Sequence, residues 1–177
     1  MQTDTVKKYS LQSRKELGAT DRVDYWGCNT EYGKLTDVLV GPVEHFKWLE
    51  TSSVSKKSLR RNVTFDLEIA KKQHKEMLSA YESANVNIHQ LKSDSNLPYQ
   101  VFARDSSIMT PFGAIITNMA QWWRRGENYK AIETYLDLQI PIFDCITAGH
   151  FEGGDFNIIE PDCVLIGWEG IGGRSQK

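Results

Sequence analysis

Short apolar stretches predict strands along most of the chain; 37–41 is a β-branched run, and 86–91 alternates apolar and polar residues. Several of these stretches end at Gly or Pro, which interrupt regular structure. Longer stretches with apolar residues three or four positions apart predict helices at 65–84 and 127–138. The predicted strands are 37–41, 86–91, 107–110, 114–118, 142–146, 156–159 and 163–167.

The first predicted helix, 65–84, has one apolar face. Thr64 is expected to cap its N-terminus, where Asp66 and Glu68 suit the positive end of the helix dipole. Residues 50–62 are rich in Ser, Lys and Arg, and they are expected to form an exposed loop. The apolar face comprises Phe65, Ile69, Met77, Leu78 and Tyr81.

Two stretches 50 residues apart, beginning at Asp105 and Asp155, have the same pattern. Each is a carboxylate, a strand, a turn with Pro and a second strand, and a weaker copy places Asn29 at the carboxylate position. Such self-similarity predicts repeated units in a solenoid or a closed propeller. In a ring, the carboxylates would point to a common centre suited to a cation. The matched pairs are Asp105 and Asp155, Ile108 and Ile158, Pro111 and Pro161, and Ile116 and Ile166.

The amino-acid composition excludes several classes of protein. The 177 residues are 40% hydrophobic and 25% charged, which is typical of a globular domain. The net charge of -2 speaks against a nucleic-acid-binding surface, and no apolar run is long enough to span a membrane. Three distant cysteines and no signal peptide predict a cytoplasmic protein without a disulfide framework. We expect an N-terminal arm at 1–22 and one domain at 23–177.

The sharpest local feature is the run GHFEGGD at 149–155. Its two adjacent glycines permit a tight turn, so that Glu152 and Asp155 could reach one cavity. The flanking Phe151 and Phe156 place this turn near a core, where carboxylates need partners. His150 and Glu152 form an H-x-E, but the cysteine pair of a zinc site does not follow, so no metal is predicted.

Two further runs combine charge with aromatic residues. In FARD at 102–105, Arg104 and Asp105 are expected to face opposite sides of a strand end, with Asp105 facing inward. The run WWRR at 122–125 is similar to a nucleic-acid patch. The acidic net charge favours instead a loop before a helix, with the tryptophans packed on the core.

Taken together and in order, four segments resemble the guanidino-group-modifying superfamily. Its members include dimethylarginine dimethylaminohydrolases, arginine deiminases and glycine amidinotransferases. The resemblance covers about residues 24–177 and implies an α/β fold, the five-bladed propeller of ββαβ units called a pentein, with about three blades present. The segments are NTEYGKLTDVLVG at 29–41, VFARD at 101–105, FEGGD at 151–155 and the stretch ending at Arg174 and Ser175.

In this superfamily a cysteine thiolate attacks the guanidinium carbon, an amine leaves, and water or an acceptor amine resolves the thiouronium intermediate. The resemblance implies two catalytic acids here: Asp105 would accept hydrogen bonds from the guanidinium, and Glu152 would orient a catalytic histidine. Asn118 stands where some relatives have an arginine for the substrate carboxylate. The implied substrate-binding residues are Asp94 at the amino group, Phe102 as a pocket wall, Asp105, Asp155 lining the turn, and Arg174 at the carboxylate.

The family's histidine and nucleophilic cysteine lie beyond the segment that matches its arginine motif, and this sequence stops at Lys177. Cys145 and Cys163 lie in apolar strand runs and are expected to be inert core thiols. Cys28 has no supporting motif either. We therefore expect this chain alone to be inactive and prone to aggregate, unless a partner chain fills the gap.

Three functions stay open on this sequence. The first is a hydrolase acting on arginine or a methylated arginine, with citrulline as product. The second is an amidinotransferase, which needs an acceptor amine and gives ornithine. The third is a non-enzymatic binding protein of the same fold. The expected partner is a small arginine-like guanidino substrate, no cofactor is implied, and a homo-oligomer stays possible.

Overall fold

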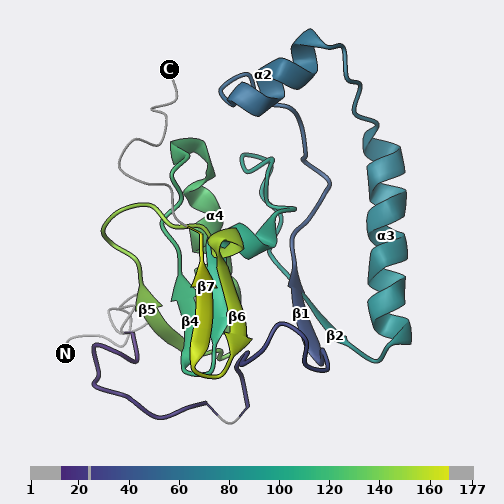
Figure 1. The fold of residues 1–177 in the computed structure, drawn as a ribbon. Coiled ribbons are helices and arrows are strands. Elements are labelled where there is room, and N and C mark those ends of the chain that lie inside the picture. The colour runs from purple at the N-terminus through teal and green to yellow at the C-terminus, as the bar shows by residue number, and fades with distance from the viewer. Residues whose placement is uncertain (1–12, 24, 168–177) are drawn as a thin grey trace, which may run out of the picture.

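The computed structural model describes residues 13–23 and 25–167, which form an α/β arrangement of short strands and helices (Figure 1). In chain order the elements are β1 (Asp37–Val40), α2 (Ser53–Arg60), α3 (Leu67–Ser83), β2 (Asn87–Gln90), η1 (Ala103–Ser106), β3 (Ser107–Thr110), β4 (Gly113–Ile116), η2 (Trp122–Arg124), α4 (Gly126–Asp137), β5 (Ile142–Cys145), η3 (Gly153–Asp155), β6 (Phe156–Glu160) and β7 (Cys163–Ile166). All seven predicted strands are confirmed within one or two residues, as is the helix at 127–138.

The strands form three small sheets whose connections repeat. β3 and β4 make an antiparallel hairpin, and β5 returns beside β4 in parallel after α4. β6 and β7 make a second antiparallel hairpin, and each hairpin follows a single 3-10 turn, η1 or η3. In the first unit only β1 and β2 pair, in parallel; residues 25–36 contain no strand. The sequence repeat thus corresponds to a repeat of local structure.

The helix α2 corrects the prediction of a loop at 50–62. The hydroxyl of Ser52 accepts a hydrogen bond from the Ser55 backbone N–H and caps the helix. Ser55 itself is buried, with its Oγ 2.8 Å from the hydroxyl of Tyr99. A polar residue therefore forms the inner contact of α2, which is why the hydrophobic pattern did not reveal this helix.

The long helix α3 begins two residues later than predicted, and the predicted cap is wrong. The carboxylate of Asp66, not Thr64, accepts hydrogen bonds from the backbone N–H groups of Glu68 and Ile69. α3 lies along the outer side of the β1–β2 pair (Figure 1), and Ile69 and Met77 of the expected apolar face are exposed. The half-buried stripe of α3 comprises Leu67, Ala70, Lys71, His74, Leu78 and Tyr81.

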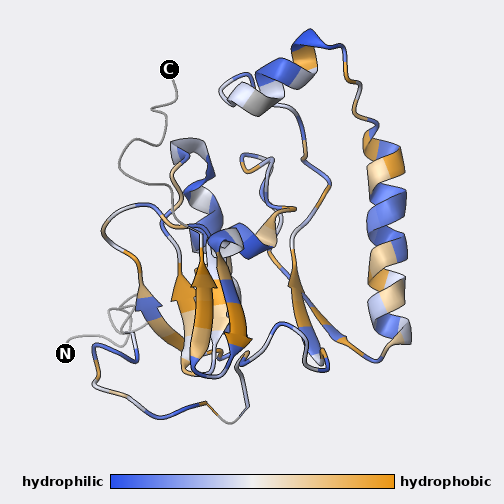
Figure 2. Cartoon of the chain, viewed as in Figure 1, coloured by the Kyte–Doolittle hydropathy of each residue, from blue (hydrophilic) through white to orange (hydrophobic). Residues whose placement is uncertain are grey.

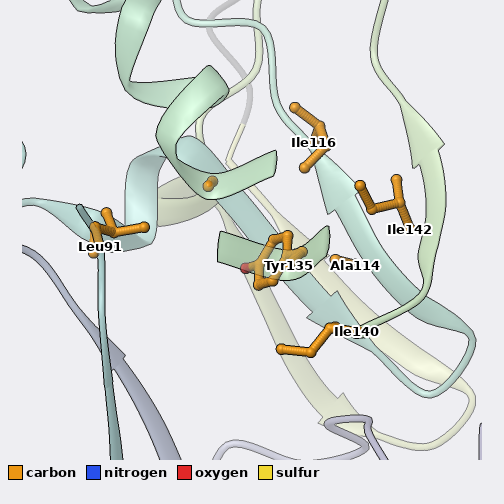
Figure 3. Close-up of a cluster of buried hydrophobic side chains, with 8 residues drawn as sticks. Leu91, Ala114, Ile116, Tyr135, Ile140 and Ile142 are labelled. Atoms are coloured by element: carbon orange, nitrogen blue, oxygen red, sulfur yellow. The ribbon is translucent and has the colours of Figure 1, made fainter. Parts of the chain in front are cut away.

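The main hydrophobic core lies between α4 and the β3–β4–β5 sheet. Figure 3 shows Tyr135 of α4 over Ala114, with Ile116 and Ile142 from the neighbouring strands beside them. The Tyr135 hydroxyl lies 2.6 Å from Ser107 Oγ, so its polar end is satisfied inside the core. The eight core residues are Leu91, Ala103, Ala114, Ile116, Ala131, Tyr135, Ile140 and Ile142.

The start of the described chain contacts a sheet edge, whereas its last strand is left exposed. Arg14 and Lys15, in the expected N-terminal arm, donate backbone hydrogen bonds to Ile142 and Phe143 of β5. In contrast, β7 is apolar along its length (Figure 2) and all four of its residues are exposed. Among the described residues, no helix combines the length and apolar character needed to cross a membrane.

Candidate functional site

The turn η1 holds Asp105 in place directly before β3. Thr117 donates a hydrogen bond through Oγ1 to the backbone oxygen of Asp105, at 2.7 Å. The side-chain amide of the buried Asn128 donates to the backbone oxygens of Ser106 and Thr117. The backbone of this turn is thus tied to β4 and α4 by buried polar contacts, which fix the direction of the carboxylate.

Asp105 pairs with a buried arginine that the sequence analysis did not select. Nη1 of Arg124 lies 2.8 Å from Oδ2 of Asp105, and the other side of the guanidinium makes two hydrogen bonds to Glu127. Arg124 is 6% exposed and Glu127 is 1% exposed. Burial disfavours the charged form of Arg124, but the bonds to Glu127 and Asp105 outweigh it and raise its pKa.

The sequence did contain a signal for this network. Arg124 and Glu127 stand three residues apart at the start of a predicted helix, where such side chains meet. The run WWRR is a 3-10 turn leading into α4, which confirms a segment before a helix. The expectation that both tryptophans pack on the core is wrong for Trp122, which is 67% exposed.

Aromatic rings line one side of the network. The Arg124 guanidinium lies 5.9 Å from the ring centre of Tyr99 and 5.6 Å from that of Phe102. Phe102 is 48% exposed, and its ring also contacts Phe46. This partly open aromatic surface beside Asp105 already accommodates one planar cation.

The turn at 149–155 brings Glu152 near Asp105 and Arg124. Asn118, just after β4, forms a two-way backbone bridge with Phe151 and donates its side-chain amide to the Gly149 oxygen. Glu152 follows Phe151 and is half-buried. Burial raises the pKa of Glu152, Arg124 opposes this rise, and the nearby charge of Asp105 adds to it.

Gly153 and Gly154 allow the backbones of η1 and η3 to approach each other closely. A Cβ added to Gly153 would lie 1.9 Å from the backbone oxygen of Arg104, and one on Gly154 would lie 3.2 Å from Oδ1 of Asp105. The turns η1 and η3 therefore pack backbone against backbone. The glycines thus allow this close approach in addition to the expected turn, which explains how two repeat units share one site.

Arg104 and Asp105 lie in the 3-10 turn η1 and not at a strand end, which corrects the predicted local structure. Their side chains nevertheless have different partners. Arg104 binds Glu31 and the backbone oxygen of Phe156, whereas Asp105 binds Arg124. Arg104 therefore links η1 to β6, and Asp105 is left to the candidate site.

The other predicted site residues are placed differently from one another, and Asp94 has its partners outside this cluster. Asp155 is exposed in η3, and its charge contributes to the raised pKa of Glu152. The Asp94 carboxylate accepts from the Asn96 backbone N–H, which lowers its pKa, and lies 3.6 Å from Lys130 Nζ. Arg174 falls outside the described residues.

The described cysteines stand apart from this cluster. Cys28 donates to the backbone oxygen of Thr30, and burial followed by the charge of Asp144 raises the pKa of the half-buried Cys145. Cys163 is exposed on β7, so the expectation of a core thiol there is wrong. Within 13–23 and 25–167, no group of three or more His, Cys, Asp or Glu side chains is arranged to hold a metal ion.

The site thus gathers Asp105, Glu127 and Glu152 around one cation, Arg124, and the charge of Asp155 acts on Glu152. Only Oδ2 of Asp105 is occupied by Arg124, and Oδ1 has no hydrogen bond from any described residue. Excess negative charge beside an aromatic ring favours a planar, hydrogen-bonding cation. A hollow on α2 has the opposite character, since Lys56, Lys57, Arg60 and Arg61 line it.

A sequence model of a family described as eukaryotic N,N-dimethylarginine dimethylhydrolase matches residues 48–165, well over half of the chain. The chain belongs to this family. The match includes both Asp105 and Glu152, and it confirms the resemblance to guanidino-group-modifying proteins.

Relatives of this family member share parts of its sequence and fold. The uncharacterized protein YkgA of Bacillus subtilis is 29% identical over 140 residues, which is 79% of this chain and 48% of that protein. A variant of the dimethylarginine dimethylaminohydrolase of Pseudomonas aeruginosa, solved with citrulline, matches with a TM-score of 0.52 and 22% identity, over 69% of this chain and 46% of that one.

A third relative is the amidinotransferase SxtG of Microseira wollei, from the saxitoxin biosynthetic pathway. It matches with a TM-score of 0.57 and 16% identity, over 75% of this chain and 54% of that chain. At these identities the two structures show a shared fold. The chain spans about half the length of these relatives.

Proposed function

We propose that the protein is part of a hydrolase acting on the guanidinium group of arginine or a methylated arginine. The observation that carries this proposal is the meeting of Asp105 and Glu152, from two successive repeat units, beside the open face of Phe102. Membership in the dimethylarginine dimethylhydrolase family supports the substrate class.

The geometry of Asp105 suits a guanidinium ligand. Its Oδ1 is available to accept an N–H, while Arg124 holds Oδ2 and thereby limits rotation of the carboxylate. The ring of Phe102 is 48% exposed and already lies 5.6 Å from the Arg124 guanidinium, and its exposed part would cover the planar group of the substrate. Asp155, Asp94 and Arg174 are the proposed contacts for the rest of the substrate.

For the reaction, we propose the thiouronium route. A thiolate would attack the guanidinium carbon, the bond from that carbon to the departing nitrogen would break, and the amine would leave with a proton. Water would then add to the carbon and release citrulline and the thiol. Glu152 would orient the histidine that supplies and removes these protons. We assign the nucleophile to neither Cys145 nor Cys163.

We further propose that the repeat units belong to a five-bladed propeller. The exposed apolar face of β7 supports this, because a neighbouring blade would cover it. Such a ring would place Asp105 and Glu152 at its centre.

Product analysis tests this function. The protein, expressed from its natural coding region, would be incubated with arginine or Nω,Nω-dimethylarginine, with and without glycine as an acceptor amine. Citrulline without an acceptor supports the hydrolase. Ornithine formed only with glycine would replace it by an amidinotransferase, and binding without either product would replace it by a non-enzymatic binding protein.

Two variants test whether the product formed in this assay depends on Asp105. Asp105→Asn removes the charge at the candidate site, whereas Asp162→Asn removes a charge from the exposed β6–β7 turn. Citrulline formation is expected to fall at least about a hundredfold in the first variant and to stay unchanged in the second. Equal activity in both variants would contradict the role of Asp105.

A further inference from the structure

One face of α2 forms a basic hollow of about 550 Å³, and all the residues that line it are exposed. Positions 56–61 contain four of the chain's 21 Lys and Arg residues, although the net charge of the whole chain is -2. The segment 53–61 contains no Asp or Glu that could balance this charge. The hollow is lined by Ser53, Lys56, Lys57 and Arg60 of α2 and by Arg61, which follows the helix as its C-cap.

The basic side chains of this hollow differ from those of the other helices in having no protein partner. On α3, Lys71 lies 2.8 Å from Glu68, and on α4, Lys130 lies 3.2 Å from Glu133. Among the described residues, by contrast, none of the four basic side chains in the hollow forms an ion pair or a hydrogen bond. Their N–H groups are therefore available to an anionic ligand.

The opposite face of α2 anchors the helix (Figure 1). At about 100° per residue, the positions that line the hollow lie on the far side of the helix from Ser55. The buried Ser55 lies 2.8 Å from the Tyr99 hydroxyl, which also accepts a hydrogen bond from the Leu49 backbone N–H. The backbone beneath the hollow is thus fixed before a ligand binds, which lowers the entropic cost of binding. The hollow is also separate from the candidate site, because Tyr99 lies between α2 and Arg124.

The number and spacing of the cations favour more than one phosphate group. A phosphate monoester carries about −1.5 to −2 charges at neutral pH, so two or more are needed to balance four cations. Lys56 and Arg60 are one helical turn apart, about 6 Å along the axis, and linked phosphates can contact both. The first turn of α2 has no acidic residue to repel an anion, and Ser53 offers a hydroxyl donor there.

We propose that the basic hollow on α2 binds a small anion that carries two or more linked phosphate groups. Lys56 and Lys57 contact one phosphate, and Arg60 and Arg61 contact the next through charge-assisted hydrogen bonds. The hydroxyl of Ser53 donates to the phosphate at its end of the row. The ligand is a free molecule of the size of a tripolyphosphate or a nucleoside triphosphate, and the volume of the hollow lies in the range of small-molecule sites.

Isothermal titration calorimetry on the 177-residue chain at about 0.15 M salt tests this proposal with tripolyphosphate, ATP and inorganic phosphate. Tripolyphosphate and ATP are expected to bind with similar affinity, and inorganic phosphate at least about tenfold more weakly. The double variant Lys56→Gln with Arg60→Gln is expected to raise the Kd for tripolyphosphate at least about tenfold. The matched control, Lys72→Gln with Lys75→Gln, removes two charges from the exposed side of α3 and should leave this Kd unchanged.

A two-dimensional NMR titration of the unsubstituted chain with tripolyphosphate provides a second measurement. Saturable shifts are expected at the backbone amides of 53–61 and not at those of Lys72 and Lys75. The absence of saturable binding would overturn the proposal, as would equal weakening by the two double variants or equally tight binding of inorganic phosphate. Binding to vesicles that contain a phosphatidylinositol bisphosphate, but not to tripolyphosphate or ATP, would replace it by a membrane contact.

Discussion

Arg124 bridges Asp105 and Glu127 with all three of its guanidinium nitrogens. The contact to Asp105 measures 2.8 Å, and it joins the start of α4 to the turn before β3. A buried guanidinium thus holds the carboxylate that we assign to substrate binding. Removing this cation would leave Glu127 as a buried charge without a partner.

Arg124→Met is therefore expected to lower the free energy of unfolding by about 3–5 kcal/mol. Adding Glu127→Leu should recover most of that loss, because the buried charge is removed together with its partner. Urea unfolding followed by circular dichroism measures both values. A loss below about 1 kcal/mol in the single variant would show that the network does not stabilise the fold.

The raised pKa of Glu152 predicts how the stability of the protein depends on pH. Since burial raises its folded pKa above the ordinary value of 4.5, the folded protein holds this proton more tightly than the unfolded chain does. The charge therefore costs stability at neutral pH, and the cost disappears as the pH falls below that ordinary value. Glu152→Gln should increase the free energy of unfolding at about pH 7 and leave it unchanged at about pH 4.

The matched control for that measurement is Glu160→Gln at the exposed end of β6, which should change stability little at either pH. If Glu152→Gln instead lowers the free energy of unfolding at neutral pH, then the buried charge of Glu152 does not destabilise the folded protein, and the prediction is wrong.

Gly153 tests the close approach of η1 and η3. Gly153→Ala would place its methyl group 1.9 Å from the Arg104 backbone oxygen, so the two turns must separate. We expect a loss of about 2 kcal/mol or more in thermal or urea unfolding. Gly126→Ala is the control, because its methyl group would meet only the end of the flexible Leu97 side chain. Equal effects of both substitutions would argue against backbone packing at this site.

The N-terminus of α3 tests a point on which sequence and structure differ. Asp66→Ala removes the observed cap and should cost about 1 kcal/mol, whereas Thr64→Ala should cost little. Unfolding of the two variants under the same conditions compares them directly. A larger loss at Thr64 would support the cap that the sequence indicated.

The sequence predicted all seven strands, because they are short apolar or β-branched runs bounded by turns, and one of them, 86–91, alternates apolar and polar residues. It also selected Asp105 from the repeated hairpin pattern, and Glu152 from the glycine run at 149–155 and the family resemblance. It missed α2, whose inner contact is the hydroxyl of Ser55 on Tyr99. Such a contact depends on residues 44 positions apart, so no local pattern reveals it.

The sequence also missed Arg124 as part of the site. The run was expected to form a loop before a helix with its tryptophans packed on the core, and net charge gave no reason to bury one of its two arginines. Its burial depends on Glu127 and on Asp105, which is 19 residues away. The spacing of Arg124 and Glu127 was the only local signal, and it gained meaning once α4 was placed on the sheet.

The central claim is that Asp105 and its aromatic neighbour bind a guanidinium group. The most direct measurement is a two-dimensional NMR titration of the 177-residue chain with Nω,Nω-dimethylarginine, and with lysine as a cation without a planar fork. We expect saturable shifts at the backbone amides of Asp105, Gly153 and Gly154 for the guanidinium compound. Asp105→Asn should weaken binding at least about tenfold, and Asp162→Asn should not. Equal binding by both variants, or an equal response to lysine, would contradict the claim.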